Sequence, residues 1–330
     1  MSPSPVMERF DDMDNNCAIQ LRNITKSFGS VKANQHVSFD IRKHEVLAIL
    51  GENGSGKTTV MNMLAGIYYP DEGEIFVNGK QVTIKDPKDA FDLGIGMIHQ
   101  HYKLIDVFTA LENIVLGLEP EEKNDMAAAR KKVNDICDRY GFEIDLDKKV
   151  YDMTVSQKQT LEIIKVLYRG ANILILDEPT AVLTPQEITK LFAILKNMRR
   201  DGKAIVIITH KLNEVMEISD RVTILRKGEY IGTVNTSETN ENELTEMMVG
   251  EKIVLDIARD FVEEKHKRLE VKNLTVINKD GKKVVDNVTF DLYSGEVLGI
   301  AGISGSGQKE LLEAIMGLQK PAEGSSVIYY

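Results

Sequence analysis

The sequence has no tryptophan, and its only cysteines are Cys17 and Cys137. Two cysteines cannot build the disulfide framework of a small secreted protein, so we interpret both as free thiols in a reducing compartment. The first 16 residues lack the basic region and the apolar run of a signal peptide. No apolar stretch approaches the roughly 18 residues that a membrane helix needs. We therefore expect any association with a membrane to depend on a partner.

Positive charge is also scarce. The 41 Lys and Arg residues are outnumbered by 51 Asp and Glu residues, which gives a net charge of −10. Binding along a nucleic-acid backbone relies on a basic surface, so this composition argues against nucleic acid as a partner. A few cations gathered at one place would still suffice to bind a nucleotide. With 42% hydrophobic residues, a chain of 330 residues is predicted to fold into two globular domains.

The sequence contains an internal repeat. Residues 37–74 align with residues 288–325 at a constant offset, and residues 21–28 align with residues 271–278. The first copy continues to about residue 255, whereas the second holds only the opening part of such a unit. We interpret the second copy as truncated, and a natural short form is the alternative. The predicted organisation is an N-terminal tail (1–16), a first domain (17–255), a short charged linker (256–268) and the start of a second domain (269–330).

The first domain is predicted to have an α/β fold. Apolar runs at residues 45–50, 172–176 and 204–209 are typical of buried parallel strands, and helical periodicity surrounds them. Between the first two of these runs, about residues 100–168 are mostly helical in pattern. This segment indicates a helical subdomain inserted into the domain, and the second copy is expected to begin with its own strands and loop.

One helix of the first domain is well marked at its ends. Thr184 is expected to cap its N-terminus, with Pro185 in the first turn and Glu187 completing a capping box. Gly202 is expected to follow its C-terminus. The predicted inner face of this helix consists of Ile188, Leu191, Phe192, Leu195 and Met198.

The stretch GENGSGKTT at residues 51–59 meets every position of the phosphate-loop pattern G-x-x-x-x-G-K-[ST]. Its glycines let backbone N–H groups turn inward toward phosphate oxygens, and the N-terminus of the following helix adds positive charge. Lys57 is expected to reach the β- and γ-phosphates and Thr58 to bind Mg²⁺. The alternative, a chance glycine-rich turn, does not explain the order of strand, loop and helix. The predicted nucleotide-binding residues are Gly51, Asn53, Gly54, Ser55, Gly56, Lys57, Thr58 and Thr59.

A second motif, ILILDEPT at residues 173–180, ends an apolar strand in two acids. Asp177 is predicted to hold Mg²⁺ through water, and Glu178 is predicted to orient or deprotonate the water that attacks the terminal phosphate. Two adjacent acids at the end of a strand can also form an ordinary solvated turn, which is the alternative here. The phosphate loop favours the catalytic interpretation, with ATP and Mg²⁺ as cofactors.

Together these motifs resemble those of ATP-binding cassette (ABC) ATPases, and the resemblance covers the whole chain. It implies the P-loop NTPase fold of the ABC ATPases with a helical subdomain, followed by the N-terminal part of a second copy. The resemblance also assigns roles to three further residues. Gln100 would sense and help to bind Mg²⁺ and would face the membrane subunit, His210 would contact the γ-phosphate, and Phe28 would stack on adenine.

The signature motif of the family, L-S-G-G-Q at the start of a helix, is altered here to MTVSQ at residues 153–157. Thr154 would replace the serine hydroxyl, whereas Ser156 replaces a glycine that lets the backbone approach the γ-phosphate. The alternative interpretation is that Ser156 is the N-cap of the helix, with Gln159 closing a capping box. The residues assigned to the signature are Thr154, Val155, Ser156 and Gln157.

The repeat of the phosphate loop, GISGSGQK at residues 302–309, keeps its glycines, but Gln308 stands at the lysine position and Lys309 at the hydroxyl position. In the ABC family, two cassettes pair head to tail, and each ATP lies between the phosphate loop of one and the signature of the other. The altered loop and the altered signature would therefore share one weak site, whereas Lys57 and Glu178 would hydrolyse ATP in the other. The residues of the degenerate loop are Gly302, Gly305, Gly307 and Gln308.

Double cassettes of this kind resemble the ATPases of importers for simple sugars and nucleosides, and residues 166–187 look most like the nucleoside branch. The resemblance implies a peripheral ATPase at the cytoplasmic face of the cell membrane, bound to two integral membrane permease subunits. An extracytoplasmic solute-binding protein would be an indirect partner, and a second cassette or a second copy of the chain would close the ATP site. By itself the chain is expected to have low activity. The alternatives are a soluble double-cassette factor that acts on ribosomes or nucleic acid, and a fragment that binds ATP without hydrolysing it.

Overall fold

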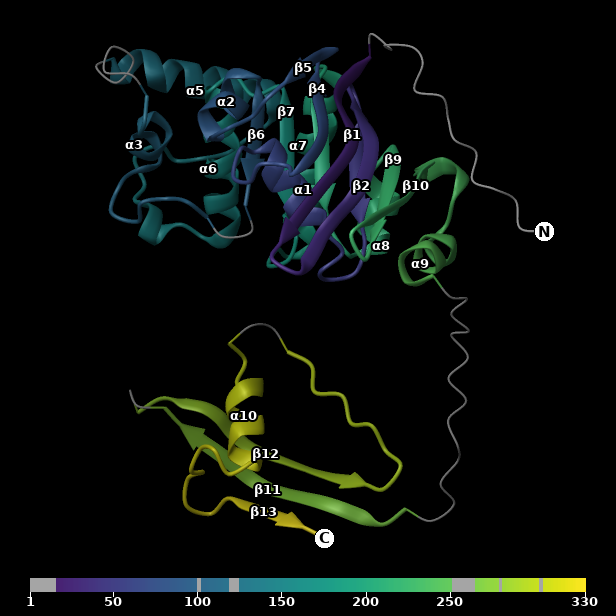
Figure 1. Cartoon of the computed structure of the whole chain (residues 1–330). Coiled ribbons are helices and arrows are strands. Elements are labelled where there is room, and N and C mark those ends of the chain that lie inside the picture. Colours follow the sequence, from purple (N-terminus) through teal and green to yellow (C-terminus); the bar gives the residue numbers. More distant parts are fainter. Residues whose placement is uncertain (1–15, 100–101, 119–124, 251–264, 279–280, 303–304) are drawn as a thin grey trace, which may run out of the picture. The chain divides into compact units, whose positions relative to one another are not determined.

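The chain divides into two units, residues 1–253 and 254–330. We describe them from a computed structural model of residues 16–99, 102–118, 125–250, 265–278, 281–302 and 305–330 (Figure 1). Each unit is considered by itself. Among these residues, no helix combines the length and the apolar character that crossing a membrane would require.

The described residues of the first unit form a ten-stranded sheet with the order β5-β4-β1-β2-β10-β9-β3-β8-β7-β6. The side of the sheet that begins with β5 is antiparallel, whereas β3, β8, β7 and β6 run parallel. The apolar runs predicted as strands are therefore confirmed as neighbours in a buried parallel sheet. The strands are β1 (Cys17–Phe28), β2 (Val31–Arg42), β3 (Val46–Leu50), β4 (Glu72–Val77), β5 (Lys80–Val82), β6 (Ile95–Ile98), β7 (Ile173–Asp177), β8 (Ala204–Ile208), β9 (Arg221–Arg226) and β10 (Glu229–Asn235).

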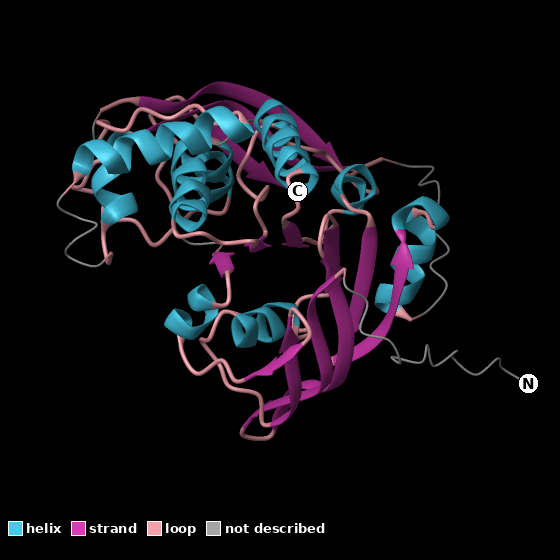
Figure 2. Ribbon diagram, turned by 90° about the horizontal axis from the view of Figure 1, so that it is seen from above, coloured by secondary structure: helices cyan, strands magenta, loops and turns pink. Residues whose placement is uncertain are grey.

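Helices cover both faces of this curved sheet (Figure 2). The side chains of the central strand β3 alternate between two apolar clusters, as the two-residue period of a strand requires. Leu47 and Ile49 pack in the cluster that contains α1, whereas Ala48 and Leu50 pack in the cluster of α8 and α9. The helices are α1 (Lys57–Leu64), α2 (Pro87–Asp92), α3 (Ala110–Val115), α5 (Met126–Tyr140), α6 (Val155–Tyr168), α7 (Pro185–Arg200), α8 (Leu212–Ile218) and α9 (Glu241–Val249), with short 3₁₀ turns η1 (Val150–Asp152) and η2 (Thr236–Glu238).

The helix predicted after Thr184 is confirmed as α7. The Thr184 hydroxyl accepts a hydrogen bond from the Glu187 N–H, and the Glu187 carboxylate accepts one from the Thr184 N–H. The helix ends at Arg200, and Gly202 follows with a φ of 95°. Four of the five residues of the predicted inner face are buried, and Ile188 packs at the edge of the same core.

The alternative cap that we considered for the next helix upstream is wrong. The N-cap of α6 is Thr154, whose hydroxyl accepts a hydrogen bond from the Gln157 N–H at 3.2 Å, and Gln157 closes the capping box. Ser156 lies inside the first turn. Both Thr154 and Ser156 have a glutamine three residues later, so the sequence offers two capping boxes. The structure selects the earlier one because the side chain of Gln159 is buried and donates to the backbone oxygen of Pro179 at 2.7 Å.

A buried ion pair links the first residue of β9 to β2 and to the residue that precedes β3. The Arg221 guanidinium lies 2.9 Å from a carboxylate oxygen of Glu45 and 3.0 Å from one of Asp40. Glu45 is only 6% exposed. Removing one partner of a buried pair leaves the other charge without compensation, which typically costs about 3–5 kcal/mol.

We therefore expect Arg221→Met to lower the free energy of unfolding of the first unit by about 3–5 kcal/mol in a urea titration. The matched control is Arg42→Met, because Arg42 pairs with Asp40 at the surface, where such a pair contributes about 0–1 kcal/mol. Equal losses of stability in the two variants would contradict this account of the buried pair.

The described residues of the second unit form a smaller sheet of three strands, with the order β12-β11-β13, and one helix. In the first unit, β2-β1-β4 has the same arrangement. The helices that follow the two phosphate-loop sequences also begin alike, because Gly56 has φ 92° and ψ 3°, and Gly307 has φ 88° and ψ 7°. The elements are β11 (Lys267–Ile277), β12 (Lys283–Tyr293), α10 (Gln308–Ile315) and β13 (Ser326–Tyr329).

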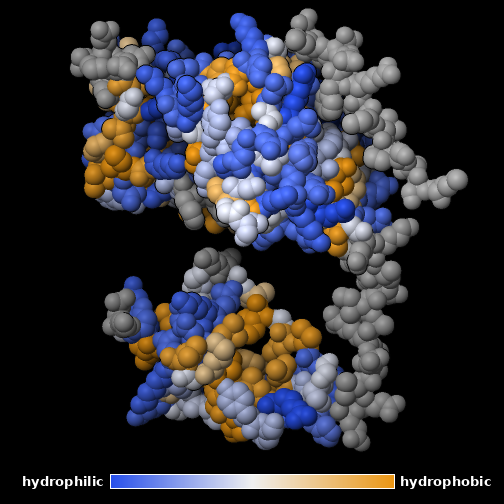
Figure 3. Space-filling view, in the orientation of Figure 1, coloured by the Kyte–Doolittle hydropathy of each residue, from blue (hydrophilic) through white to orange (hydrophobic). Residues whose placement is uncertain are grey.

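One element of the repeat has a different structure in the two units. The counterpart of β3, residues 297–301, forms no strand in the part of the second unit that the structure describes. In the first unit β3 is hydrogen-bonded between β8 and β9, and the described residues of the second unit include no such neighbours. Apolar residues consequently stay at the surface: Val297 is 84% exposed, and the visible face of this unit is rich in hydrophobic side chains (Figure 3).

Candidate functional site

The candidate site lies at the carboxyl ends of three neighbouring parallel strands, β3, β8 and β7. The phosphate-loop sequence follows β3 and leads directly into α1. Asp177 ends β7, and His210 comes two residues after β8. Strand ends of one parallel sheet meet at the same edge, which is where α/β proteins bind their ligands. The fold thus brings together residues that lie more than a hundred positions apart in the sequence.

Two glycines of the loop are required by close approach of the backbone. A Cβ atom at Gly51 would lie 2.2 Å from the backbone oxygen of Leu225, and one at Gly56 would lie 2.3 Å from that of Ala33. Both glycines also have positive φ angles, and Gly56, with a φ of 92°, lies in the left-handed region that favours glycine. Gly54 has a positive φ as well. The tight curl that the sequence predicted for residues 51–59 is therefore present.

The Lys57 side chain is folded over this loop. Its ammonium group donates hydrogen bonds to the backbone oxygens of Gly51 at 2.8 Å and Glu52 at 2.9 Å. Burial lowers the pKa of Lys57, while the negative charges of Glu178 and Asp177 act in the opposite direction. The structure therefore places one buried cation within the electrostatic reach of two carboxylates. Thr59 lies beside these residues in the first turn of α1.

The loop also contains a buried hydroxyl group whose hydrogen-bonding capacity is unused. Ser55 is 3% exposed, and within the described part of the chain its Oγ atom has no hydrogen-bond partner. A buried hydroxyl without a partner is unfavourable, and a ligand that accepts a hydrogen bond from it would remove this cost. A phosphate oxygen is such an acceptor. Together with the glycine cradle and the cation of Lys57, Ser55 makes the loop a good fit for a phosphate group.

Asp177 and Thr58 lie close together. Burial raises the pKa of Asp177 and the charge of Glu178 raises it further, whereas the neighbouring Thr58 hydroxyl and the charge of Lys57 lower it. A cation bound beside Asp177 would favour its ionised form. A hydroxyl and a carboxylate are oxygen ligands of the type that Mg²⁺ uses beside nucleotide phosphates, so the residues present fit this ion.

Glu178 and His210 form the second polar contact of the site. The Nδ1 atom of His210 lies 3.1 Å from a carboxylate oxygen of Glu178. The His210 side chain is 57% exposed and that of Glu178 22%, so both remain accessible to a ligand. The backbone of Glu178 is in the left-handed region, with a φ of 47°, and its N–H donates to the Ile208 oxygen at 2.9 Å. The neighbouring strand β8 therefore helps to hold the backbone of Glu178 in an uncommon conformation.

Phe28 ends β1 and is 44% exposed. Its ring contacts that of Tyr68 in an edge-to-face arrangement with the centroids 5.0 Å apart. The ammonium group of Lys26 lies 5.6 Å from the centre of the Phe28 ring. Exposed aromatic faces of this kind can stack on a flat heterocycle. The sequence identified Phe28 but not Tyr68, because nothing in the local pattern indicates that the segment after α1 returns to β1.

The four residues assigned to the signature lie together at the N-terminus of α6. Thr154 and Gln157 are occupied in the capping box, Val155 is exposed, and Ser156 lies near Glu187, in the first turn of α7, whose pKa it helps to lower. The hydrogen bond from Gln159 to the Pro179 oxygen connects α6 to the segment that follows β7. Gln100 lies outside the described residues, so its predicted role stays a prediction.

The described glycines of the degenerate loop, Gly305 and Gly307, have positive φ angles like Gly54 and Gly56, whereas the side chains that follow them differ. A Cβ atom at Gly307 would lie 2.2 Å from the Val284 oxygen, which repeats the close approach made by Gly56, and Gly305 has a φ of 84°. The amide of Gln308 lies against Gly302, so close that a Cβ at Gly302 would be 2.5 Å from Gln308 Nε2. Lys309 is 80% exposed and lies 3.7 Å from Glu313 on the same helix. The cation therefore points away from the loop.

Three further polar residues lie beside the site. Thr180, Lys211 and Glu214 are connected by hydrogen bonds in the segments that follow Glu178 and His210. The position of Lys211 directly after His210 was the only feature of the sequence that could have indicated this cluster. The partners of Lys211 could not be inferred, because they depend on how the turns after β7 and β8 meet.

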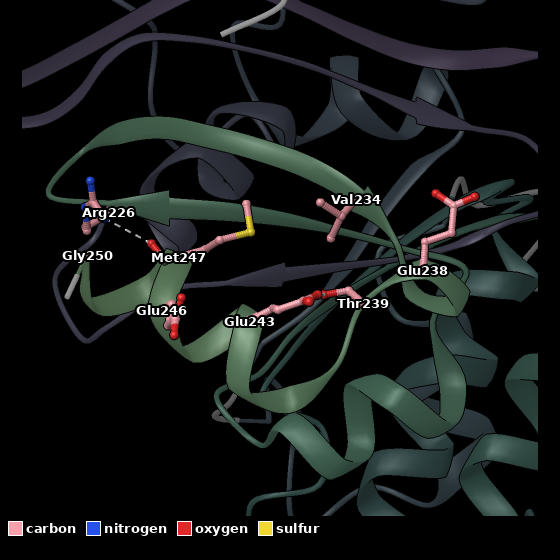
Figure 4. A pocket seen from close by; sticks show the side chains of 8 residues that line it. All are labelled: Arg226, Val234, Glu238, Thr239, Glu243, Glu246, Met247 and Gly250. Carbon is pink, nitrogen blue, oxygen red and sulfur yellow. Dashed lines mark hydrogen bonds between the residues drawn. The ribbon is translucent and has the colours of Figure 1, made fainter. Parts of the chain in front are cut away.

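A pocket of about 490 Å³ lies apart from these residues, between α9 and the strands β9 and β10 (Figure 4). It is lined by Arg226, Met247 and three glutamates, and Arg226 donates a hydrogen bond to the Met247 oxygen at 3.2 Å. None of the predicted site residues lines it. The phosphate-loop site therefore remains the candidate functional site.

Comparisons with known proteins identify relatives of the chain. The family described as "ABC transporter" matches residues 34–181 and 285–329. The nucleoside import ATP-binding protein NupA of Lactococcus lactis is 45% identical over 315 residues, which cover 95% of this chain and 62% of that protein. The guanosine import ATP-binding protein NupO of Bacillus subtilis is 46% identical over 309 residues, which cover 93% of this chain and 61% of that protein. The chain thus spans about three fifths of the length of these relatives.

A solved structure has a similar fold. The ADP conformation of MJ1267, an ATP-binding cassette of an ABC transporter, superposes with a TM-score of 0.63 at 25% sequence identity. The superposition covers 71% of this chain and 99% of that cassette. The coverage corresponds to a single cassette, and the first unit, residues 1–253, has the matching size.

Proposed function

The chain belongs to the ABC transporter family, and from this premise we propose that it is an ATP-binding and ATP-hydrolysing subunit that powers import of a nucleoside or a simple sugar. The observation that carries the proposal is the convergence of Lys57, Asp177 and Glu178 at one sheet edge, with electrostatic interaction between the lysine and both acids. A phosphate-binding loop, a metal-binding pair and an accessible carboxylate are the parts that ATP hydrolysis needs.

The phosphate groups of ATP would be held by the loop at residues 51–59. Backbone N–H groups, the Ser55 hydroxyl and the Lys57 ammonium would donate to phosphate oxygens, at the N-terminus of α1. Phe28, with Tyr68 beside it, would stack on the adenine ring. Thr58 and Asp177 would hold Mg²⁺, with Gln100 as a further contact, and the ion would supply neutralisation of charge on the phosphates.

Glu178 would carry the proton-transfer step. Its carboxylate would orient the attacking water or accept its proton, and it is accessible enough to do so. His210 would hold Glu178 in place through the 3.1 Å contact and present its other ring nitrogen to the γ-phosphate. These roles divide the work of the site between positioning the phosphate and activating the water.

The second unit is proposed to be the beginning of a second cassette. The support is the repeat in the sequence, the common strand order and the common start of the two helices. Gln308 lacks the charge of Lys57, and Lys309 lacks the hydroxyl of Thr58. A site formed by this loop and the signature at residues 154–157 would therefore bind ATP weakly or turn it over slowly.

The proposed partners follow from the import function. Two integral membrane permease subunits would bind the ATPase at the cytoplasmic face of the cell membrane, and an extracytoplasmic solute-binding protein would deliver the solute. A second cassette or a second copy of the chain would close the ATP site. Two relatives named for nucleoside and guanosine import favour a nucleoside as the solute. The rival proposal of a factor that acts on ribosomes or nucleic acid is disfavoured by the net charge of −10.

Uptake by cells tests this function. Cells whose only copy of this gene encodes the Lys57→Ala variant are expected to take up at least one labelled solute, guanosine, uridine or ribose, at least about tenfold more slowly. Lys80→Ala, at an exposed lysine of the edge strand β5, is the control and should leave uptake unchanged. Normal uptake of all three solutes in the Lys57→Ala cells would argue against the import of nucleosides and ribose.

A further inference from the structure

A small hydrogen-bonded cluster lies next to the two residues proposed to activate water. Thr180 follows Glu178 by two positions, Lys211 follows His210 directly, and Glu214 belongs to α8. The Thr180 hydroxyl donates to a Glu214 carboxylate oxygen at 2.5 Å. Thr180 is 2% exposed and Glu214 4%, so both are removed from solvent. A buried carboxylate in this position needs partners, and the cluster provides them.

Lys211 completes the cluster. Its ammonium group lies 2.9 Å from the second carboxylate oxygen of Glu214, 3.0 Å from the backbone oxygen of Thr180 and 3.3 Å from the Thr180 hydroxyl. An ammonium group has three N–H donors, and three acceptors of the protein surround this one. A lysine beside the histidine would otherwise be an obvious ligand for the γ-phosphate. Because its donors are used by Thr180 and Glu214, we assign Lys211 a role within the protein and not in binding phosphate.

The cluster joins two turns that carry the reactive side chains. Thr180 belongs to the turn after β7, which also holds Glu178, and Lys211 belongs to the turn after β8, which also holds His210. The Glu178 N–H donates a hydrogen bond to the Ile208 oxygen of β8 at 2.9 Å. The φ of 47° at Glu178 is unfavourable for a residue with a side chain, and such conformations persist only where their surroundings impose them. The bonds made by Thr180 and Lys211 supply that restraint.

We infer that Thr180, Lys211 and Glu214 are positioning residues that hold the Glu178 carboxylate against His210. The expected effect on ATP hydrolysis rests on the proposed ATPase function, whereas the effect on the contact between Glu178 and His210 does not. None of the three residues has to touch ATP. Loss of the cluster is therefore expected to separate Glu178 from His210 and to slow the chemical step without weakening the binding of ATP to the loop at residues 51–59.

The first test reads the contact directly, by nuclear magnetic resonance of the full chain labelled at its histidine rings. The His210 signal is assigned as the one lost in a His210→Ala variant. Glu178→Gln removes the charge at 3.1 Å and is expected to shift this signal. Thr180→Val, which replaces the hydroxyl by a methyl group of similar size, should shift the His210 signal in the same direction. Thr180→Ser should give the signal the position that it has in the unsubstituted chain. An unmoved signal in Thr180→Val would overturn the inference.

The second test measures the effect on catalysis, as the rate of single-turnover ATP hydrolysis with the full chain in excess over ATP. Thr180→Val and Lys211→Met are expected to slow hydrolysis at least about tenfold, with the dissociation constant of MgATP changed less than about twofold. Thr180→Ser should recover most of the rate. Equal loss of affinity and rate, or no rescue by serine, would show a general structural role and contradict the inference. Loss of hydrolysis in the unsubstituted chain would count against the proposed function alone, because the resonance test still decides the contact.

Discussion

Lys57→Ala is expected to weaken MgATP binding to the chain by about two orders of magnitude. The Lys57 ammonium is the buried cation of the phosphate loop, and charge-assisted hydrogen bonds to phosphate contribute about 3 kcal/mol, or roughly 100-fold in affinity. The measurement is equilibrium binding of MgATP, with Lys80→Ala as the control for removing one positive charge elsewhere.

The lysine also holds the loop, since it donates to the oxygens of Gly51 and Glu52. Lys57→Met keeps much of the length and burial of the side chain but removes the charge and the hydrogen bonds to the loop. It should lose as much affinity as the alanine variant. If both variants bound MgATP as tightly as the unsubstituted chain, residues 51–59 would not be the nucleotide site.

Glu178→Gln is expected to abolish turnover while leaving ATP binding within about threefold. An amide keeps the shape of the side chain but cannot accept a proton from water, and general-base catalysis contributes about 10²–10⁴-fold. The measurement is single-turnover hydrolysis with the chain in excess over ATP, alongside equilibrium binding of MgATP.

The control for this substitution is Glu217→Gln, which removes an exposed carboxylate from α8. It should hydrolyse ATP at the rate of the unsubstituted chain. A Glu178→Gln variant with near-normal turnover would mean that the base is another residue. Loss of MgATP binding in the same variant would mean that Glu178 acts mainly in nucleotide binding, which would contradict its proposed role.

The sequence predicted which motifs lie together at the edge of the sheet, because each motif belongs to a buried strand. The strands β3, β7 and β8 were recognisable from continuous apolar runs, and residues at the carboxyl ends of neighbouring parallel strands must meet. The proximity of Lys57, Asp177 and His210 therefore follows from the pattern alone. The cap of α7 was equally predictable, because Thr184 and Glu187 form its capping box within four residues.

Other features depended on contacts distant in sequence. The choice between Thr154 and Ser156 as the cap of α6 was decided by the burial of Gln159 against the segment after β7. The counterpart of β3 at residues 297–301 forms no strand in the described structure because a strand forms only beside hydrogen-bonding neighbours. The Thr180–Lys211–Glu214 cluster likewise requires two turns to come together, and no local pattern encodes that.

The most direct measurement is an equilibrium titration that counts MgATP molecules bound per chain. The account predicts one tightly bound MgATP, because Lys57, Thr58 and Asp177 are proposed to form one half-site, whereas Gln308 and Lys309 leave the second loop without the matching charge and hydroxyl. The Lys57→Met substitution should remove that molecule. A count of one that persists in the Lys57→Met variant, or a count of zero for the unsubstituted chain, would contradict the assignment of residues 51–59 as the ATP site.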